Sequence, residues 1–524
     1  MSDAENRCFE VLERELKTLS FANQQLERRS INPNIKSHPN YSLPHFTKTT
    51  QRPAGLSAEE TYAGRSNLVY VAPGTNAKKS GMSVALNAHI DVVAPYFPPR
   101  LKNGIVFGRG ACDDKGPVVA MVTALKILSE IGKQTGLSIN KNIVAMFVIE
   151  EETGGNGSLS LAVDRELKKK YDSVLVGECA GLKIYPANRG AVWYRAEVKP
   201  PKGISAFEMT AFIIEELEKE GAAIRAESRH KLFPQRPVQT CHGIIGPFGE
   251  HPSRICGRVG FVVQFEKHPG KETEALVRDC LESGLSQYIA LYGDKTKVSD
   301  PATGKPMVTR HYDFKRAGNS FEVTVYGATG HMGAIRERDG AITKMACMVR
   351  SLIFSEAKLS ANGPVHLQLA NSGDLNIVLE GGQGFVPTHS INEVMERMRQ
   401  AAEYGAENYL YRCGRAESGA QAVTVTYEKL HNAAFDGDPD SPTMRNAIAA
   451  AKACDLWKDE PVKGWTVSCD ARLFATEYPG MPVLTFGPGE LAFAHSDQEQ
   501  IAIKDIMKAA EFLALFLLRQ TGTI

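Results

Sequence analysis

The sequence has almost no excess of charge of either sign. Lys and Arg together number 61 and Asp and Glu number 60, so the formal net charge is +1. A protein that binds phosphates or anionic lipid usually has a strong basic excess, which this chain lacks. The composition therefore argues against nucleic acid or a membrane as a partner.

Long apolar runs and paired cysteines are also missing. No apolar stretch reaches the length that spans a bilayer, and residues 1–20 mix both charges without the apolar core of a signal peptide. The ten cysteines form no C-x-x-C pair, which is typical of reduced thiols in a reducing compartment. We therefore expect a cytoplasmic protein.

Shorter apolar runs are present, and three of them end abruptly at charged residues. They read VALNAHIDVVAP from Val84, INKNIVAMFVIEEE from Ile139 and YDSVLVGECAG from Tyr171. Residues 115–132, between the first two, have apolar residues at helical spacing. This order predicts an α/β sheet with a crossover helix, and ligands of such sheets bind beyond the carboxyl ends of the strands.

The 524 residues are too many for one hydrophobic core, so we expect several domains. Two runs of short strands and helices, both close to the order β, α, β, β, α, predict two ferredoxin-like units at 193–317 and 318–431. Together they would form an inserted α+β lid, with a single unduplicated insertion as the alternative. Residues 1–192 and 432–524 would then form a discontinuous α/β catalytic domain, a mixed sheet flanked by helices. Within it, Ser441 is a candidate N-cap of a helix.

Four segments supply residues of types that can bind metal ions, each at the end of an apolar run. They are His89 and Asp91, Asp113 and Asp114, Glu150, Glu151 and Glu152, Glu178, and His495. Imidazole and carboxylate are ligands of borderline divalent ions, and thiolate is not required. These residues therefore predict a centre for two ions such as zinc.

Local spacing adds detail to this metal prediction. Residues i and i+2 share a strand face, so Asp91 can accept the second ring N–H of His89 and fix its tautomer. Three glutamates directly after a buried strand need compensating charge, which a metal cluster would supply, and one of them would be free as a general base. Cys112 and Cys179 each adjoin a candidate ligand, but adjacent strand residues face opposite sides, so we expect both to pack away from the metals.

Seven segments together resemble a known family. They are NAHIDVV, GRGACDDKGP, EEETGGNGS, VGECAG, NRG, GATGHMGA and FGPGELAFAHSD. In this order they resemble the two-zinc metallopeptidases that include acetylornithine deacetylase, succinyl-diaminopimelate desuccinylase, aminoacylase, carnosinase, carboxypeptidase G and peptidase V. The resemblance spans nearly the whole chain, and D-D-K-G-P with a doubled lid is most similar to peptidase V-type dipeptidases.

The resemblance implies roles for the metal-binding residues. His89 and Glu178 would bind one zinc, Glu152 and His495 the other, and Asp113 would bridge them. Asp91 would orient His89, and Glu151 would be the general base. Cobalt and manganese accept the same donors and remain alternatives to zinc.

The resemblance also implies residues on the substrate side. His331 would stabilise the oxyanion, Arg472 would clamp the substrate carboxylate, and Asn376 would lie near the substrate. The Asn376 match is imperfect, because Leu379 stands where the family usually has proline. A doubled lid can supply His331 from the same chain, which favours a competent monomer, with a homodimer as the alternative.

The expected reaction is hydrolysis of an amide bond in a dipeptide or an N-acyl amino acid. A hydroxide held between two zinc ions would attack the carbonyl after Glu151 removes a proton from water. The alternatives are a deacylase of the acetylornithine deacetylase type, a carbamoyl amidohydrolase, and a catalytically inactive protein that retains the metals for binding.

Overall fold

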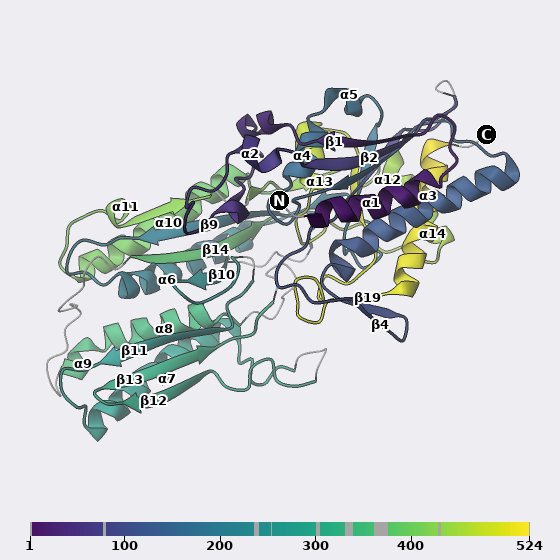
Figure 1. Ribbon diagram of the computed structural model, residues 1–524. Coiled ribbons are helices and arrows are strands. Elements are labelled where there is room, and N and C mark those ends of the chain that lie inside the picture. The colour runs from purple at the N-terminus through teal and green to yellow at the C-terminus, as the bar shows by residue number, and fades with distance from the viewer. Residues whose placement is uncertain are drawn as a thin grey trace. The chain divides into compact units, whose positions relative to one another are not determined.

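Two separate units make up the chain in this computed structural model (Figure 1). The structure describes residues 3–76, 80–234, 240–252, 254–299, 304–330, 339–360, 376–427 and 431–522. The first unit comprises Met1–Gly190, Arg229–Gln235 and Lys429–Ile524, and the second comprises Ala191–Ser228 and Arg236–Glu428. The expected domain boundaries, 192/193 and 431/432, lie within three residues of the limits of the two units. Residues 229–235 were not expected in the first unit.

A six-stranded mixed sheet forms the centre of the first unit. Its strands, in spatial order, are β1 (Gln25–Ser30), β2 (Ser66–Ala72), β6 (Ile143–Val148), β3 (Val84–His89), β7 (Ser173–Gly177) and β18 (Val483–Phe486). The last four run parallel, and the first two continue the sheet antiparallel. The three apolar runs are thus β3, β6 and β7, as predicted.

Helices cover both faces of this sheet. One face packs against α1 (Asp3–Lys17), α3 (Gly116–Thr135), α12 (Pro442–Ala453) and α14 (Ile503–Thr521), and the other against α4 (Asn156–Ala162), α5 (Arg165–Lys168) and α13 (Ala471–Glu477). In β6, Ala145 and Phe147 enter the first layer, and Val144 and Met146 enter the second. Because both faces are buried, the strands are apolar at every position, which explains the uninterrupted runs in the sequence.

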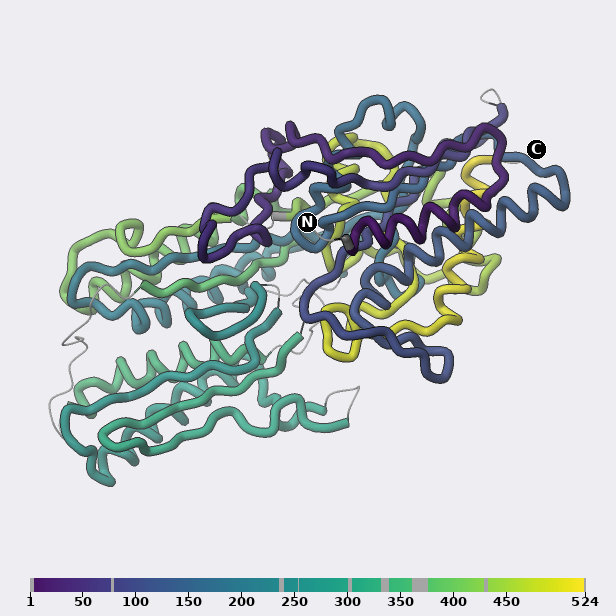
Figure 2. Tube along the Cα trace, in the orientation of Figure 1, coloured from purple at the N-terminus to yellow at the C-terminus, as the bar shows by residue number. Residues whose placement is uncertain are grey.

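Short elements complete the first unit. They are η1 (Pro33–Ser37), η2 (His45–Thr47), α2 (Ala58–Tyr62), β4 (Arg100–Lys102), β5 (Ile105–Phe107), η3 (Ala111–Lys115), β8 (Ala187–Asn188), β16 (His431–Asn432), β17 (Phe435–Asp436) and β19 (Gln500–Ala502). Figure 2 traces the purple N-terminal and yellow C-terminal segments into this same unit. Ser441 caps α12 as predicted, because its side chain accepts a 3.2 Å hydrogen bond from the Met444 N–H.

The second unit contains two further antiparallel sheets. The first has the order β10 (Thr240–Ile245), β14 (Ile377–Phe385), β9 (Gly190–Val198) and β15 (Val423–Thr426), with α6 (Ala206–Glu227), α10 (Ile391–Arg412) and α11 (Gly419–Ala422). The second has the order β11 (Arg258–Gln264), β13 (Ser320–Tyr326) and β12 (Tyr312–Ala317), with α7 (Lys271–Tyr292), α8 (Ala341–Phe354) and α9 (Glu356–Ser360). In chain order the first sheet reads β, α, β, β, α, β, the order of a ferredoxin-like unit.

The expected division of this insertion at 317/318 needs correction. Residues 317 and 318 lie at the turn that joins β12 to β13, and these two strands pair, with Ala317 opposite Ser320. The strands of the first sheet come from both ends of the insertion, and those of the second sheet come from its middle. The two sheets are therefore nested in the sequence and do not follow one another. Periodicity locates strands but carries no information about which strands pair.

In the parts of the chain that the structure describes, every helix is too short or too polar to cross a bilayer.

Candidate metal centre

Three parallel strands bring the candidate ligands to one edge of the sheet. His89 is the last residue of β3, Glu150 to Glu152 follow β6, and Glu178 follows β7. In the register of the sheet, His89 lies opposite Val148 of β6. Because carboxyl ends of neighbouring parallel strands meet at the same edge, these side chains converge although they are far apart in sequence.

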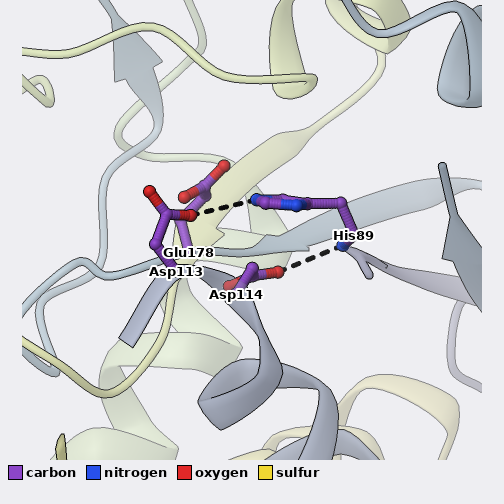
Figure 3. A group of neighbouring side chains, drawn as sticks. All are labelled: His89, Asp113, Asp114 and Glu178. Carbon is purple, nitrogen blue, oxygen red and sulfur yellow. Dashed lines mark hydrogen bonds and ion pairs between the residues drawn. The ribbon is translucent and has the colours of Figure 1, made fainter. Parts of the chain in front are cut away.

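One group of side chains lies around His89 (Figure 3). It contains His89, Asp113, Asp114 and Glu178, all buried, with ligand atoms within 4.8 Å of one another. Figure 3 shows the His89 ring directed at Asp113, and the distance from Nε2 to Oδ1 is 3.0 Å. This group offers one imidazole and several carboxylate oxygens to a single ion.

A second group shares Asp113 with the first. It contains Asp113, Glu152 and His495, again with ligand atoms within 4.8 Å of one another. His495 Nε2 lies 2.9 Å from Glu152 Oε2 and 3.2 Å from Asp113 Oδ2. The structure therefore brings all five predicted ligands together, with one Asp113 oxygen directed to each histidine.

Asp91 connects the His89 ring to the run of glutamates. Its carboxylate lies 3.4 Å from His89 Nδ1 and accepts hydrogen bonds from the backbone N–H groups of Glu151 and Glu152, at 3.2 and 3.1 Å. Burial tends to raise the pKa of Asp91, but His89 and the two N–H groups outweigh it and lower that pKa. Asp91 is therefore placed to orient the His89 ring.

The buried carboxylates of the centre lie close to one another. Burial raises the pKa of Glu178 and of Asp114 well above the usual values, and the carboxylate of Asp113 raises them further. Asp114 Oδ2 accepts a 3.1 Å hydrogen bond from the His89 N–H, but within the described residues its other oxygen has no hydrogen-bond partner. Nitrogen and oxygen donors of this kind fit divalent ions, whose charge would compensate the carboxylates.

The three consecutive glutamates have different surroundings. Glu150 accepts a 2.9 Å hydrogen bond from the Tyr62 hydroxyl and pairs with the buried Arg65, while Glu152 faces His495. Among the described residues, none donates a hydrogen bond to the Glu151 carboxylate. Burial, and next the charge of Asp470, raise the pKa of Glu151 well above its usual value.

The expectation that a metal cluster compensates these three glutamates therefore needs correction at Glu150. Its charge is balanced by Arg65, a residue 85 positions earlier in the chain. Arg65 is itself paired with Glu5 at 2.5 Å. Sequence reasoning missed Arg65 and Tyr62, because neither lies in a motif or beside an apolar run of the site.

The predicted substrate-binding residues belong to neither of the two ligand groups found in the described residues. Arg472, on α13, is only 3% exposed, and its Nη2 donates a 3.0 Å hydrogen bond to the Gly154 carbonyl. Burial lowers the Arg472 pKa. Asn376 is exposed and directly precedes β14 in the second unit, and His331 lies outside the described residues.

Cys112 and Cys179 pack together with Ala494 in a small buried apolar cluster. Each residue of this cluster directly adjoins one of the candidate ligands Asp113, Glu178 and His495. Neither cysteine belongs to the two ligand groups found in the described residues.

Sequence relatives of this chain include named hydrolases. A LysW-lysine/LysW-ornithine hydrolase from Saccharolobus islandicus is 28% identical over 110 residues, which are 21% of this chain and 29% of that protein. A relative from Pyrobaculum aerophilum, whose name proposes the same activity, is 29% identical over 202 residues, 38% of this chain and 54% of the relative. The chain thus spans about half the length, or less, of these curated relatives.

Two solved structures share the fold, and a family match covers most of the chain. A di-peptidase from Saccharomyces cerevisiae has a TM-score of 0.52 at 13% identity, covering 98% of this chain and 90% of its own. Human carnosine dipeptidase 1 has a TM-score of 0.50 at 13% identity, covering 98% of this chain and 91% of its own. Residues 85–519 match the family described as Peptidase family M20/M25/M40. The chain therefore belongs to peptidase family M20/M25/M40.

Proposed function

We propose that this chain is a metal-dependent amidohydrolase that cleaves an amide bond in a dipeptide or an N-acyl amino acid. The observation that carries the proposal is the pair of ligand groups joined by Asp113. A half-buried carboxylate, Glu151, lies beside them and belongs to neither. Two ion sites with an adjacent free base are the arrangement that metal-assisted hydrolysis requires.

The proposed ligands divide between two ions. His89 and Glu178 would hold one, Glu152 and His495 the other, and Asp113 would contact both. Zinc is the ion proposed, and cobalt and manganese accept the same donors. Ions bound there would polarise the amide carbonyl and lower the pKa of a water molecule.

We propose that protein side chains transfer the proton and orient a metal ligand. Glu151 takes a proton from water and delivers it to the departing amine, a role that needs a carboxylate with no competing partner. Its environment supports this role, since burial raises its pKa above the usual value of a glutamate. Asp91 supports the same centre by orienting the His89 ring.

For the substrate we propose contacts from three residues, namely His331 to the reacting oxygen, Arg472 to a carboxylate and Asn376 to the backbone or acyl group. The burial of Arg472 and its bond to the Gly154 carbonyl favour an additional role, support of the turn that follows Glu152. His331 would come from the same chain, so we propose that a monomer is active.

The test is hydrolysis of a panel of dipeptides and N-acetyl amino acids by protein loaded with zinc. We expect amino acid release that chelation abolishes and that Glu151→Gln reduces by about 10² to 10⁴-fold while two ions stay bound. Glu166→Gln, at an exposed position on α5, is the matched control and should keep full activity. The panel also separates a dipeptidase from a deacylase.

Two outcomes would contradict the proposal. Binding of no metal by the native chain would remove its basis. Binding of two ions without turnover on any substrate, in the native chain and in Glu151→Gln alike, would favour a metal-retaining binding protein.

A further inference from the structure

Glu499 is a buried carboxylate that holds the backbone next to the shared ligand. Its side chain is 0% exposed, and Oε1 accepts hydrogen bonds from the N–H groups of Cys112 and Asp113, at 3.1 and 3.0 Å. These two N–H groups belong to the short helical turn that presents the Asp113 side chain to both ligand groups. Glu499 therefore contacts the support of Asp113 and not its carboxylate.

Arg109 balances the charge of Glu499. The Nη1 atom of Arg109 donates a 2.6 Å hydrogen bond to Glu499 Oε2, and the arginine side chain is 1% exposed. Its Nε donates to the Pro95 carbonyl at 3.2 Å, and the guanidinium lies 5.0 Å from the centre of the Phe97 ring. An arginine held at three points keeps the Glu499 carboxylate in a single orientation.

The segment that carries Glu499 also carries His495, four residues earlier. Directly after Glu499, β19 pairs with β5, with Gln500 opposite Phe107. The Glu499 carbonyl also accepts a 3.0 Å hydrogen bond from the Gly108 N–H. One buried carboxylate thus joins the segment that carries His495 to the turn that carries Asp113, and these two side chains lie 3.2 Å apart.

We propose that Glu499, held by Arg109, is a positioning residue of the metal centre that sets the separation of Asp113 and His495. This inference rests on the proposed function, because it assigns a purpose to residues that surround the proposed ligands. Residues that hydrogen-bond to metal ligands and orient them typically account for about 10 to 100-fold in metal affinity.

Substitution at Glu499 can separate positioning from simple stability. In Glu499→Gln the amide oxygen can still accept from the two backbone N–H groups, but the amide N–H₂ would face the Arg109 donor. The turn that carries Asp113 therefore loses its fixed orientation while the volume of the side chain is unchanged. Arg109→Lys keeps the positive charge but cannot reach Glu499 and the Pro95 carbonyl together, so its effect should be smaller.

The experiment is a calorimetric titration of the metal-free 524-residue chain with zinc, together with the unfolding temperature of each metal-free variant. We expect the affinity for at least one of the two ions to fall about 10 to 100-fold in Glu499→Gln, and less in Arg109→Lys. Glu490→Gln, at an exposed position in the same loop, is the matched control and should bind both ions like the native chain.

The outcomes separate this inference from the proposed function. Native affinity in Glu499→Gln, with a lower unfolding temperature only, would show that Glu499 is merely structural and would overturn the inference. Two ions bound by the native chain in that same titration would leave the proposed function standing. If the native chain bound no zinc, the proposed function itself would fail.

Discussion

Buried charges around the proposed metal centre are balanced by residues that are remote in sequence. Glu150 and Arg65 have side chains that are 4% and 5% exposed, and Tyr62 donates to the same carboxylate. Glu150 also adopts a positive φ of 67°, at the start of the turn that carries Glu151 and Glu152. The contacts of Glu150 therefore define the path of the backbone into the site.

Removal of the Arg65 charge should lower the free energy of unfolding. Arg65→Met leaves Glu150 buried without its cation, and breaking a buried ion pair on one side costs about 3 to 5 kcal/mol. The hydrogen bond that Tyr62 still donates to Glu150 should keep the loss of unfolding free energy at about 3 kcal/mol. The free energy of unfolding, measured by chemical denaturation, tests this expectation.

The control for Arg65 is Arg28, whose partner Glu13 is also in the first unit. The Arg28 side chain is 31% exposed, so Arg28→Met should cost less than about 1 kcal/mol. Equal losses of unfolding free energy in the two variants would show that the Arg65–Glu150 pair contributes no more to stability than an exposed ion pair.

Several site residues could be predicted from local sequence patterns, and others could not. His89 ends β3 and Asp91 stands two positions later, so local geometry suffices to predict their contact. The five proposed ligands follow apolar runs or match family motifs. The partner of Glu150 lies 85 residues away in a segment without any motif, and no local pattern indicates it.

At the scale of elements, packing of α6 against α10 buries an acid whose ionisation should affect stability. Glu208 on α6 accepts a 2.5 Å hydrogen bond from the Tyr409 hydroxyl on α10. Burial raises the pKa of Glu208 from 4.5 to about 7, and the charge of Glu356 adds to the effect while the Tyr409 bond opposes it. The folded chain therefore binds this proton more tightly than the unfolded chain does.

The stability of the second unit should consequently fall as pH rises. Between about pH 4.5 and 7 the folded state holds the Glu208 proton and the unfolded state does not, so the free energy of unfolding decreases with pH. One unit of pKa is worth about 1.4 kcal/mol, so the loss between pH 5 and pH 8 should approach roughly 3 kcal/mol. Denaturant unfolding at a series of pH values measures it.

Glu208→Gln should remove this part of the pH dependence, because the amide does not titrate. Glu272→Gln, at an exposed position on α7 of the same unit, should leave it unchanged. An identical pH profile in the native chain and in Glu208→Gln would refute the assignment to Glu208.

For the whole molecule, the proposed ions should add to the stability of the first unit. An ion that binds only the folded state stabilises it by about 2.7 kcal/mol at a concentration 100 times its dissociation constant. Chelation should therefore lower the unfolding temperature of the transition that contains the sheet of the first unit, and zinc should restore it. Differential scanning calorimetry with and without chelator measures this shift.

Glu152→Gln should show a smaller shift on chelation, because it loses one ligand of the second group. The exposed Glu166→Gln should behave like the native chain. An unfolding temperature that does not respond to chelator or to added zinc would contradict metal binding at this centre.

Local patterns in the sequence predict which segments are buried strands, which are helices, and which polar residues stand at the strand ends. Periodicity, the cap of α12 and charge at the end of an apolar run are local signals, so each can be recognised within a few residues. Only the folded chain shows which strands pair in the second unit, that Arg65 contacts Glu150, and that Glu499 contacts the turn of Asp113. These contacts join positions 85 and 386 residues apart, and they exist only after the chain has folded.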